Sequence, residues 1–315
     1  MSEQNNIEDK TMKSLDVLVC IPAYNAESTI SEAVKRCQKF ADLVLVINDG
    51  SSDNTEKVAR KAGADIITHR KNRGYGGAIK TALEEGLKRN ARVTITFDAD
   101  LQHDAKDIPK IIEPILSNES DIVIGSRFLE KNTGVKTYRK FGIRFITSLV
   151  RLFSGNNIRD AESGFRGYSI DSLKQLIPML ETEGMGMSAE ILLKASVSKL
   201  KIVEVPRKEM YPENVQTSSQ NPLKHGLSVI LTILKLVIET KPLVAFGIPS
   251  IFFFINSIIG SVYVVNFYNE IGRLPLGMTV FTVLLISIGF FLLLAAMILY
   301  VLTRISYRIN FVTKR

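Results

Sequence analysis

Two long apolar stretches near the C-terminal end of the chain constrain its architecture most. Leu243–Val265 contains no charged residue, and neither does Leu276–Leu302. Each exceeds the roughly 20 residues that a helix needs to cross about 30 Å of hydrocarbon. Two buried core helices are the alternative, but such helices rarely run this far without a charge. We therefore predict a transmembrane hairpin over residues 242–303, with spans at about 243–265 and 276–302.

Charge around this hairpin predicts its orientation. The link at 266–275 holds only Arg273 against Glu270, whereas basic residues gather before the first span and after the second. These residues are Lys224, Lys235, Lys241, Arg304, Arg308, Lys314 and Arg315. By the positive-inside rule, a multi-pass protein of the cell membrane with this pattern keeps both termini, including a basic tail at 304–315, in the cytoplasm. Residues 1–13 lack the apolar core of a signal peptide and are expected to form a disordered leader.

The net charge of +8 does not indicate a protein that binds nucleic acid. The basic residues are spread over the chain and the membrane flanks, and no basic run is interleaved with aromatic residues. Attraction to anionic lipid headgroups explains this distribution better. Cys20 and Cys37 fall in a predicted strand and a predicted helix, where we expect them to pack as small apolar side chains.

Strand-like and helical segments alternate over the first 125 residues. Apolar, β-branched runs occur at 15–21, 43–47, 65–68, 93–97 and 121–124, and helical periodicity lies between them at 28–40, 54–62, 76–88 and 108–116. This alternation predicts an α/β domain over residues 14–220, with a parallel sheet and helices on both faces. Ligands of such sheets bind at the carboxyl ends of the strands.

The alternation loosens after Gly125. A basic helix is expected at 138–153, a Gly- and Ser-containing stretch at 163–168 and another helix at 188–200. At 221–241, polar residues recur every three or four positions opposite a wall of Leu, Ile and Val. This pattern predicts a juxtamembrane amphipathic helix that lies in the membrane interface, or one that packs on the α/β domain.

Asp98 and Asp100 directly follow the predicted strand at 93–97. In an extended backbone, residues i and i+2 point the same way, so both carboxylates would face one divalent cation. Oxygen ligands without cysteine indicate Mg²⁺ or Mn²⁺ and not zinc. A plain surface turn would also explain this Asp-x-Asp pattern if it stood alone.

Two further segments, V-C-I-P-A-Y-N-A-E at 19–27 and V-I-N-D-G-S-S-D at 46–53, place polar turns after strands. Together with Asp-x-Asp they resemble glycosyltransferase family 2, in particular its dolichyl-phosphate mannose synthase and polyprenyl-phosphate glucosyltransferase branch. The resemblance runs in order over about residues 15–220, and the paired spans resemble one sub-branch. It implies a GT-A fold, which has a Rossmann-like, mostly parallel sheet, and a metal-dependent hexosyltransferase activity.

The resemblance also implies a donor site with two parts. The base and ribose would lie against Pro22, Tyr24, Glu27 and Asp49, and the metal on the diphosphate would be held by Asp98, Asp100 and Gln102. The family often carries Glu at the position of Ala26 and Asp at that of Asn48. These departures leave the choice of nucleotide base open.

The segment N-R-G-Y-G-G at 72–77 matches the family's Asn-x-Gly-x-Gly element. Its glycines would let the backbone approach the nucleotide sugar, and Asn72 or Arg73 would reach a phosphate. A helix that begins at Gly76 would favour that anion. A flexible turn with a solvated basic pair is the alternative.

Arginines would clamp the acceptor phosphate, because their planar fork donates two parallel hydrogen bonds. In the resembled branch this role falls to Arg127, in G-S-R-F at 125–128, and to a second arginine that is either Arg139 or Arg144. Asp160 begins an Asp-x-x-Ser-Gly-Phe-Arg element that would shape the sugar and acceptor site and orient a hydroxyl.

Two later positions complete the resemblance. Arg207, or alternatively Lys208, would belong to a mobile loop over the donor phosphates, ahead of residues 211–219. Glu190 matches an acidic position of the family. Loops of this kind close to exclude water from the reaction.

The implied reaction is inverting transfer of a sugar from a nucleotide diphosphate to dolichyl or polyprenyl phosphate, with Asp100, Arg127 and Asp160 as catalytic residues. GDP-mannose is the expected donor, with UDP-glucose and UDP-GlcNAc as alternatives. A phosphate monoester has a second pKa of about 6 and needs no base near neutrality. A polysaccharide synthase is disfavoured because the chain has no tryptophan for the Gln-x-x-Arg-Trp element of those enzymes. An inactive nucleotide-binding membrane scaffold is the alternative outside enzymology, and a homo-oligomer is left open.

Overall fold

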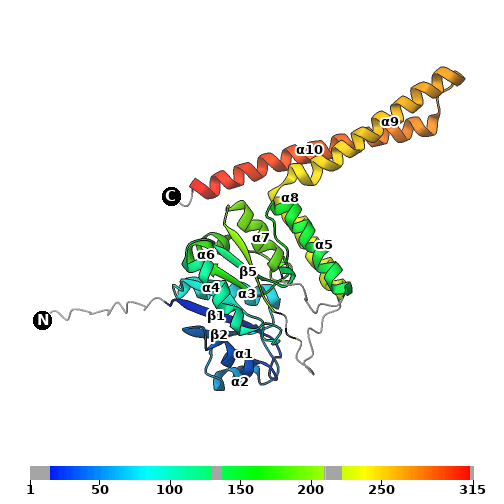
Figure 1. The fold of residues 1–315 in the computed structure, drawn as a ribbon. Coiled ribbons are helices and arrows are strands. Elements are labelled where there is room, and N and C mark those ends of the chain that lie inside the picture. The colour runs from blue at the N-terminus through cyan, green and yellow to red at the C-terminus, as the bar shows by residue number, and fades with distance from the viewer. Residues whose placement is uncertain (1–14, 130–136, 209, 211–221, 313–315) are drawn as a thin grey trace. The chain divides into compact units, whose positions relative to one another are not determined.

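The computed structural model describes residues 15–129, 137–208, 210 and 222–312, without the side chains of 137–139, 222–225 and 306–312. The predicted leader at 1–13 and the predicted mobile loop at 211–219 lie outside the described residues. The chain divides after Thr232 into two compact units (Figure 1).

A seven-stranded sheet forms the centre of the first unit, in the order β3-β2-β1-β4-β6-β5-β7 (Figure 1). Its strands are β1 (Val17–Ala23), β2 (Leu43–Asn48), β3 (Asp65–Thr68), β4 (Val93–Thr96), β5 (Ile122–Ser126), β6 (Arg166–Ser169) and β7 (Ile202–Pro206). Every neighbouring pair is parallel except the two that involve β6, which runs antiparallel to β4 and β5. The predicted mostly parallel α/β sheet is therefore confirmed.

The helices of this unit connect the strands and cover the sheet. They are α1 (Ile30–Cys37), α2 (Thr55–Lys61), α3 (Gly74–Lys88), α4 (Ile108–Leu116), α5 (Thr137–Ser154), α6 (Ile170–Leu176) and α7 (Met187–Val197). Helix α3 begins at Gly74, two residues before the predicted start at Gly76.

The central strands are apolar because side chains are buried on both sheet faces. On one face Leu18 and Cys20 of β1 join Ala78 and Ala82 of α3 in a buried cluster. On the other face the alternate residues of β1 pack with Cys37 and its neighbours from α1. Both thiols are thus buried packing groups, and burial raises their pKa values far above the ordinary range.

Strand β6 begins within the Gly- and Ser-containing stretch at 163–168, where the sequence predicted no strand. Four residues, R-G-Y-S, are too few to show a period in the sequence, and pairing with β4 and β5 supplies the missing stabilisation. Arg166, at its start, pairs with Thr96, the last residue of β4, and with Ile124 in the middle of β5. The segment that leads into β6 therefore enters the sheet at the edge where the parallel strands end.

From residue 222 onward, the described part of the chain is helical. After α8 (Pro222–Thr240), a π-helical turn at Leu243–Gly247 leads to α9 (Ile248–Ile271) and α10 (Leu276–Val312). The two long helices pack on each other through small residues: the Ser250 hydroxyl donates to the Gly289 carbonyl at 2.8 Å. Helix α10 continues to Val312, so residues 304–312 extend the helix and do not form a separate irregular tail.

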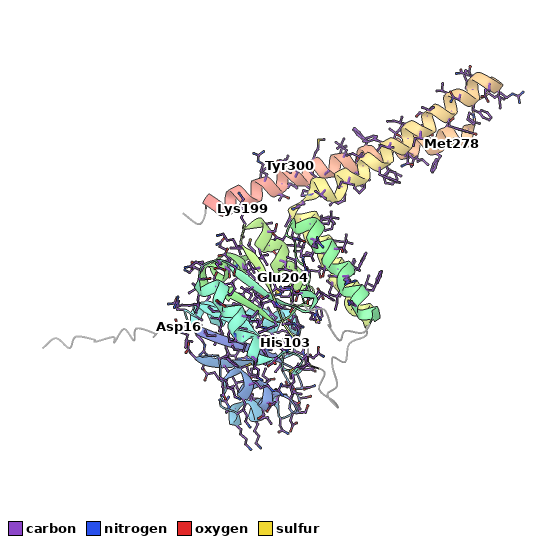
Figure 2. All side chains as sticks on the ribbon, in the orientation of Figure 1. Asp16, His103, Lys199, Glu204, Met278 and Tyr300 are labelled. Carbon is purple, nitrogen blue, oxygen red and sulfur yellow. The ribbon has the colours of Figure 1, made fainter. Side chains whose placement is uncertain are left out.

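Leu243–Ile271 and Leu276–Ile305 are long and apolar enough to cross a membrane. Only 17% of the most apolar window of each is buried, whereas a core helix of a soluble protein would be mostly buried. Figure 2 shows the side chains of α10, with Met278 and Tyr300 labelled, standing out from the helix pair. These helices are candidate membrane spans at the predicted positions.

Candidate active site

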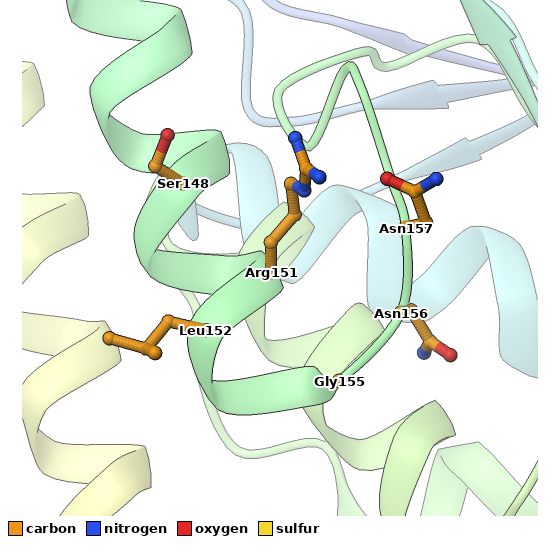
Figure 3. Close-up of a pocket in the computed structure, with 6 residues that line it drawn as sticks. All are labelled: Ser148, Arg151, Leu152, Gly155, Asn156 and Asn157. Carbon is orange, nitrogen blue, oxygen red and sulfur yellow. The ribbon is translucent and has the colours of Figure 1, made fainter.

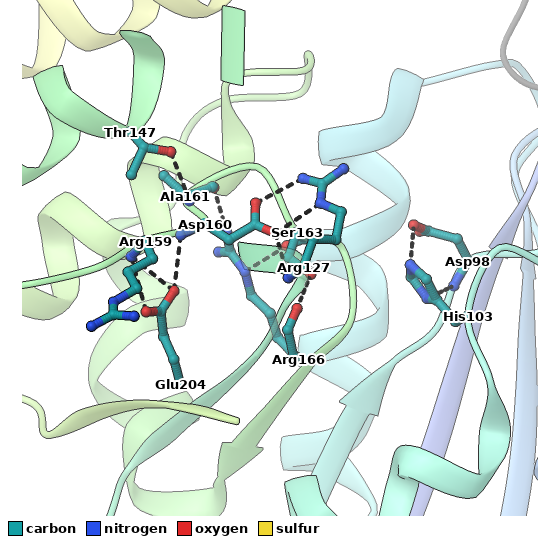
Figure 4. A network of polar contacts seen from close by, with 11 residues as sticks. Asp98, His103, Arg127, Thr147, Arg159, Asp160, Ala161, Ser163, Arg166 and Glu204 are labelled. Carbon is teal, nitrogen blue, oxygen red and sulfur yellow. Dashed lines mark hydrogen bonds and ion pairs between the residues drawn. The ribbon is translucent and has the colours of Figure 1, made fainter. Parts of the chain in front are cut away.

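The predicted site residues gather at the edge of the sheet where the parallel strands end. The turns after β1, β2, β3, β4 and β5 all leave the sheet there, and the segment 159–165 enters β6 at the same edge. Figure 4 shows Asp98 and His103 on one side of this edge and Arg127 with Asp160 on the other. Ligands of parallel α/β sheets bind in this position.

Asp98 and Asp100 lie in a tight turn and not in an extended strand. The backbone turns at 99–101, where Leu101 has a φ of 61°, and the Asp100 carboxylate accepts a hydrogen bond from the Gln102 N–H at 3.0 Å. The two carboxylates are nevertheless close neighbours. Burial, followed by repulsion from Asp100, raises the pKa of Asp98 to about 7, although Arg207, Arg127 and Arg166 partly offset this rise.

This turn offers a cation two carboxylates and no third acidic ligand. Within the described part of the chain, no group of three His, Cys, Asp or Glu side chains is arranged to hold a metal ion. The Asp98 side chain is 27% exposed, so one side of it is open to solvent. A Mg²⁺ or Mn²⁺ ion fits this donor set if water and ligand oxygens complete the coordination, as is usual for Mg²⁺ on phosphates.

His103, outside the predicted set, supports the Asp98 turn. Its Nδ1 accepts the Asp98 N–H at 3.4 Å, and its Nε2 lies 3.4 Å from the Asp98 carboxylate. The ring packs between Phe97 and Phe165, with centroid distances of 5.2 and 5.3 Å. Burial, with repulsion from Arg207 and Arg127, lowers the pKa of His103 well below its usual value, so the ring is neutral. Its role is to fix the turn.

Gly164 makes room for the same carboxylate. A Cβ atom at this position would lie 2.6 Å from Oδ2 of Asp98 and 2.8 Å from the Tyr75 hydroxyl oxygen. Such distances are far below van der Waals contact, so the Ser-Gly-Phe-Arg element needs glycine here. The 159–165 segment thus lies directly against the Asp98 carboxylate.

Arg127 and Asp160 form a buried, bidentate ion pair (Figure 4). The Nε and Nη2 atoms of Arg127 donate to the two carboxylate oxygens at 2.7 Å each, and the Arg127 backbone N–H adds a third bond at 3.0 Å. Burial alone would raise the pKa of Asp160, but the attraction and hydrogen bonds of Arg127 outweigh it and lower the pKa. Asp160 is therefore an ionised anchor for Arg127.

Strand β7 and helix α5 hold the segment that carries Asp160. Glu204 of β7 accepts the backbone N–H groups of Arg159 and Asp160, each at 2.9 Å. The Thr147 hydroxyl of α5 accepts the Ala161 N–H at 3.2 Å. The only sign of this contact in the sequence is Glu204, a charged residue within the otherwise apolar run of β7.

Arg166, the first residue of β6, holds the same segment from its other end. Its buried guanidinium donates to the carbonyls of Ser163, Ala161 and Ser188 at 2.7–3.0 Å. These bonds use the Nε, Nη1 and Nη2 atoms. The arginine of the Ser-Gly-Phe-Arg element therefore binds the protein backbone through all three guanidinium nitrogens. The position of Asp160 is therefore fixed by three separate elements.

The two alternatives for the second acceptor arginine differ in position. The Arg144 guanidinium lies over the ring of Phe128, which Arg127 also contacts. The side chain of Arg139 lies outside the described residues. Of the two alternatives, Arg144 is thus the one that shares a contact with Arg127 in the described part of the chain.

The predicted base and ribose residues are partly engaged by the protein itself. Glu27 accepts the backbone and side-chain N–H groups of Asn54 at 3.2 and 3.0 Å. Asp49 is buried and accepts the backbone N–H groups of Arg73 and Gly74 at 2.9 and 2.8 Å. These two carboxylates hold the strand-end turns together.

The other members of the pocket keep more freedom. Tyr24 is 54% exposed and can present its ring to a ligand. Pro22 lies where β1 continues past the end of β4, so its missing N–H costs no bond on that side. His69 joins Asp49 at 2.7 Å and Thr81 at 3.0 Å, which fixes the turn after β3.

The glycines at 74–77 face the protein's own chain. A Cβ on Gly76 would lie 2.6–2.7 Å from backbone atoms of residues 182–184, and Gly74 has a φ of +83°. The Arg73 guanidinium binds the Glu183 carboxylate at 2.8 Å, and the Asn72 side chain accepts the Gly74 N–H at 2.9 Å. Close packing against 182–184 already requires Gly74 and Gly76, so the role of these glycines in letting the backbone approach the nucleotide sugar stays a prediction.

Residues 181–184 are themselves anchored. The buried Glu190 of α7 accepts the N–H groups of Glu181 and Thr182 at 3.0 and 2.9 Å. Glu190, the acidic position that the resemblance singled out, thus fixes the segment against which α3 begins.

The structure distinguishes between Arg207 and Lys208, the two alternatives for the basic residue over the donor phosphates. Arg207 is buried, and its charge affects the pKa values of Asp98, His103 and Asp160. Lys208 is exposed, and its backbone N–H donates to Asp107 at 3.0 Å. Of the two, Arg207 belongs to the site.

Two shallow hollows lie elsewhere. One of about 500 Å³ is lined by the end of α5 and the following residues, including Arg151, Asn156 and Asn157 (Figure 3), and one of about 300 Å³ adjoins Arg159 and Glu204. None of the predicted site residues lines either hollow. The charged and polar side chains at the strand ends indicate the position of the site better than the volumes of these two hollows do.

The chain belongs to glycosyl transferase family 2, whose family model matches residues 18–177. A UDP-N-acetylglucosamine–dolichyl-phosphate N-acetylglucosaminyltransferase of Methanococcus voltae is 34% identical over 62% of this chain and 86% of its own length. An undecaprenyl-phosphate mannosyltransferase of Micrococcus luteus is 31% identical over 60% of this chain and 82% of its own.

Solved structures confirm the fold. Glucosyl-3-phosphoglycerate synthase from Mycobacterium tuberculosis, in complex with Mn²⁺, UDP and glucosyl-3-phosphoglycerate, matches 70% of this chain and 80% of its own. The TM-score is 0.54 at 18% identity, which supports a common GT-A fold and no more. The predicted family and fold are therefore both confirmed.

Proposed function

We propose that the chain transfers a hexose from a nucleotide diphosphate to the phosphate of a polyprenyl lipid at a membrane surface. One observation carries the proposal: a carboxylate pair and a buried arginine meet at one sheet edge. The first suits the cation of a nucleotide diphosphate and the second suits an anionic acceptor. Relatives whose names specify dolichyl or undecaprenyl phosphate as acceptor support it.

GDP-mannose is the donor that we propose first, with UDP-GlcNAc and UDP-glucose as alternatives. The names of the relatives include both an N-acetylglucosaminyltransferase and mannosyltransferases. Of the pocket that would hold the base, Tyr24 is exposed and able to stack on it, whereas Glu27 and Asp49 bind neighbouring turns.

Metal dependence belongs to this proposal. Asp98 and Asp100 would hold Mg²⁺ or Mn²⁺, with Gln102 adjacent, and His103 would keep the turn in place. When bound, the cation would neutralise charge on the departing diphosphate. The Mycobacterium tuberculosis synthase was crystallised with either Mn²⁺ or Mg²⁺, which supports this assignment.

Arg127 would orient the acceptor phosphate, and Asp160 would hold Arg127. A phosphate monoester is an anion near neutral pH and needs no proton acceptor to attack the anomeric carbon directly, with inversion. This suits Asp160, whose ion pair with Arg127 and lowered pKa make it a poor base. Arg207 would add positive charge near the donor phosphates.

The outer face of α5 suits a lipid-borne acceptor. Phe141, Phe145 and Leu152 are exposed there at spacings of four and seven, which places them on one side of the helix. Lys140, Arg144 and Arg151 form a neighbouring basic stripe with the same spacings. An apolar stripe beside a basic one favours contact with anionic membrane surfaces.

Helix α8 also exposes apolar side chains, at Leu227, Leu231, Leu234 and Ile238. We propose that it lies in the membrane interface and that α9 and α10 cross the bilayer. The cytoplasmic placement of the termini and of the catalytic unit rests on the flanking basic residues.

The test uses the purified full-length chain in detergent with Mn²⁺. Polyprenyl phosphate and the matching polyprenol would be offered in turn with GDP-mannose, UDP-glucose and UDP-GlcNAc. We expect one nucleotide sugar to give a sugar-phosphate-lipid product with the phosphate acceptor only. Equal use of the alcohol would refute the acceptor class, and nucleotide binding without transfer from any donor would favour an inactive scaffold.

A further inference from the structure

The ring of Phe128 contacts two arginines at once. The Cζ atom of Arg127 lies 5.9 Å from the ring centroid, and the Cζ atom of Arg144 lies 5.7 Å from the same centroid. Both distances are within the roughly 6 Å range of a cation–π contact. One ring therefore contacts both guanidinium groups.

The two arginines are fixed by different means. Arg127 is 7% exposed, and the Asp160 carboxylate sets its geometry through two bonds of 2.7 Å. Arg144 is exposed and makes no hydrogen bond or ion pair with any residue that the structure describes. Among the described residues, the Phe128 ring is thus a contact that orients the Arg144 side chain.

The backbone on which Arg144 stands is well placed. Ile143, Ile146, Thr147 and Val150 form the buried face of α5. The Thr147 hydroxyl, one helical turn beyond Arg144, accepts the Ala161 N–H from the segment that carries Asp160. Because the helix is fixed to this segment, only the long Arg144 side chain remains to be oriented.

We propose that Phe128 is a positioning residue that presents Arg127 and Arg144 together to a dianionic phosphate monoester. This inference rests on the proposed function and selects Arg144, not Arg139, as the second arginine. Two guanidinium groups that contact one ring would match the two negative charges of such a phosphate better than one. Without the ring, Arg144 would spread over many rotamers, and ordering it on binding would cost free energy.

The experiment measures binding of farnesyl phosphate, a short prenyl phosphate monoester, to the full-length protein in detergent micelles by calorimetry. Phe128→Leu keeps the apolar bulk and removes the aromatic face, so the dissociation constant should rise about fivefold to tenfold. Phe128→Tyr keeps the face and should stay within about twofold of wild type. Binding of the nucleotide diphosphate should not change in either variant.

A double variant separates positioning from general packing. Arg144→Ala should weaken binding about as much as Phe128→Leu does, and adding Phe128→Leu to Arg144→Ala should cost little more. Arg139→Ala should leave the effect of Phe128→Leu intact. An equal loss from Phe128→Leu with and without Arg144 would overturn the proposal, and so would wild-type affinity in Phe128→Leu.

Failure of this proposal for Phe128 can be distinguished from failure of the proposed function. Ring-dependent binding of farnesyl phosphate without sugar transfer would refute the enzyme reaction and leave the role of Phe128 intact. Transfer to polyprenyl phosphate with an unchanged KM for that acceptor in Phe128→Leu would refute the role of Phe128 and leave the reaction intact.

Discussion

On the proposed donor and acceptor sides of the site, two carboxylates respond to their surroundings in opposite ways: that of Asp98 is partly buried and that of Asp160 is fully buried. On the donor side, Asp98 stands beside Asp100, and burial with that repulsion raises its pKa to about 7. On the acceptor side, Asp160 is more deeply buried, yet Arg127 outweighs the burial and lowers its pKa. The donor side therefore has negative charge that a cation would relieve, whereas the acceptor side already contains its own cation.

This difference predicts what each side lacks. A carboxylate pair whose mutual repulsion is only partly offset by nearby arginines gains most from an ion that arrives with the ligand, so its contribution should depend on metal. A bidentate ion pair is pre-organised, so its loss should affect both stability and the use of the acceptor. The following predictions test the contrast, beginning with the largest expected effect.

Asp100→Ala should lower turnover at least about a thousandfold, because stabilising the departing diphosphate through a cation contributes several kcal/mol. Turnover is measured with saturating donor and Mn²⁺, and the melting temperature checks the fold. Asp171→Ala, which removes an exposed carboxylate on α6, is the matched control and should behave as wild type. Full activity of wild type in excess chelator would contradict the assignment of the donor side.

Asp160→Asn should destabilise the protein by about 3–5 kcal/mol, because it leaves the Arg127 charge buried without its anion. The free energy of unfolding is measured by denaturant titration in detergent. Adding Arg127→Gln should recover much of the loss, since both charges are then absent. A double variant no more stable than Asp160→Asn would show that the pair does not account for the effect.

Arg127→Lys should weaken use of the phosphate acceptor about tenfold to hundredfold, because lysine keeps the charge but loses the fork by which Asp160 holds this cation in place. The measurement is the KM for polyprenyl phosphate alongside calorimetric affinity for the nucleotide, which should barely change. Arg159→Lys, an exposed arginine on the same segment, is the control. Weaker nucleotide binding by Arg127→Lys would place this arginine on the donor side instead.

The smallest effect should be a pH dependence. The folded-state pKa of Asp160 lies below its unfolded value of 3.8, so the unfolded chain binds the proton more readily. This group thus contributes stability above about pH 4, and the contribution is lost as the pH falls through the lowered folded value. Unfolding followed from pH 6 to 3 should show a steeper loss in wild type than in Asp160→Asn. Equal slopes would mean that Arg127 does not lower this pKa.

The sequence by itself determined the features that are local. Span length and lack of charge predicted the two apolar helices, and alternating periods predicted most strands and helices of the sheet. The prediction for 108–116 matched α4 residue for residue. Motif order predicted the family, and it singled out Asp98, Asp100, Arg127 and Asp160 as members of one site.

Only the tertiary structure decided how these residues are held. The short β6 inserts antiparallel between β4 and β5, and this brings Asp160 to Arg127, 33 positions away along the chain. Glu204 supports that segment across 44 positions, and Gly74 and Gly76 of α3 are required by residues 182–184. Periodicity reports on neighbours within a few residues, whereas these contacts depend on shape and charge complementarity between distant segments, which a single sequence does not encode in any local pattern.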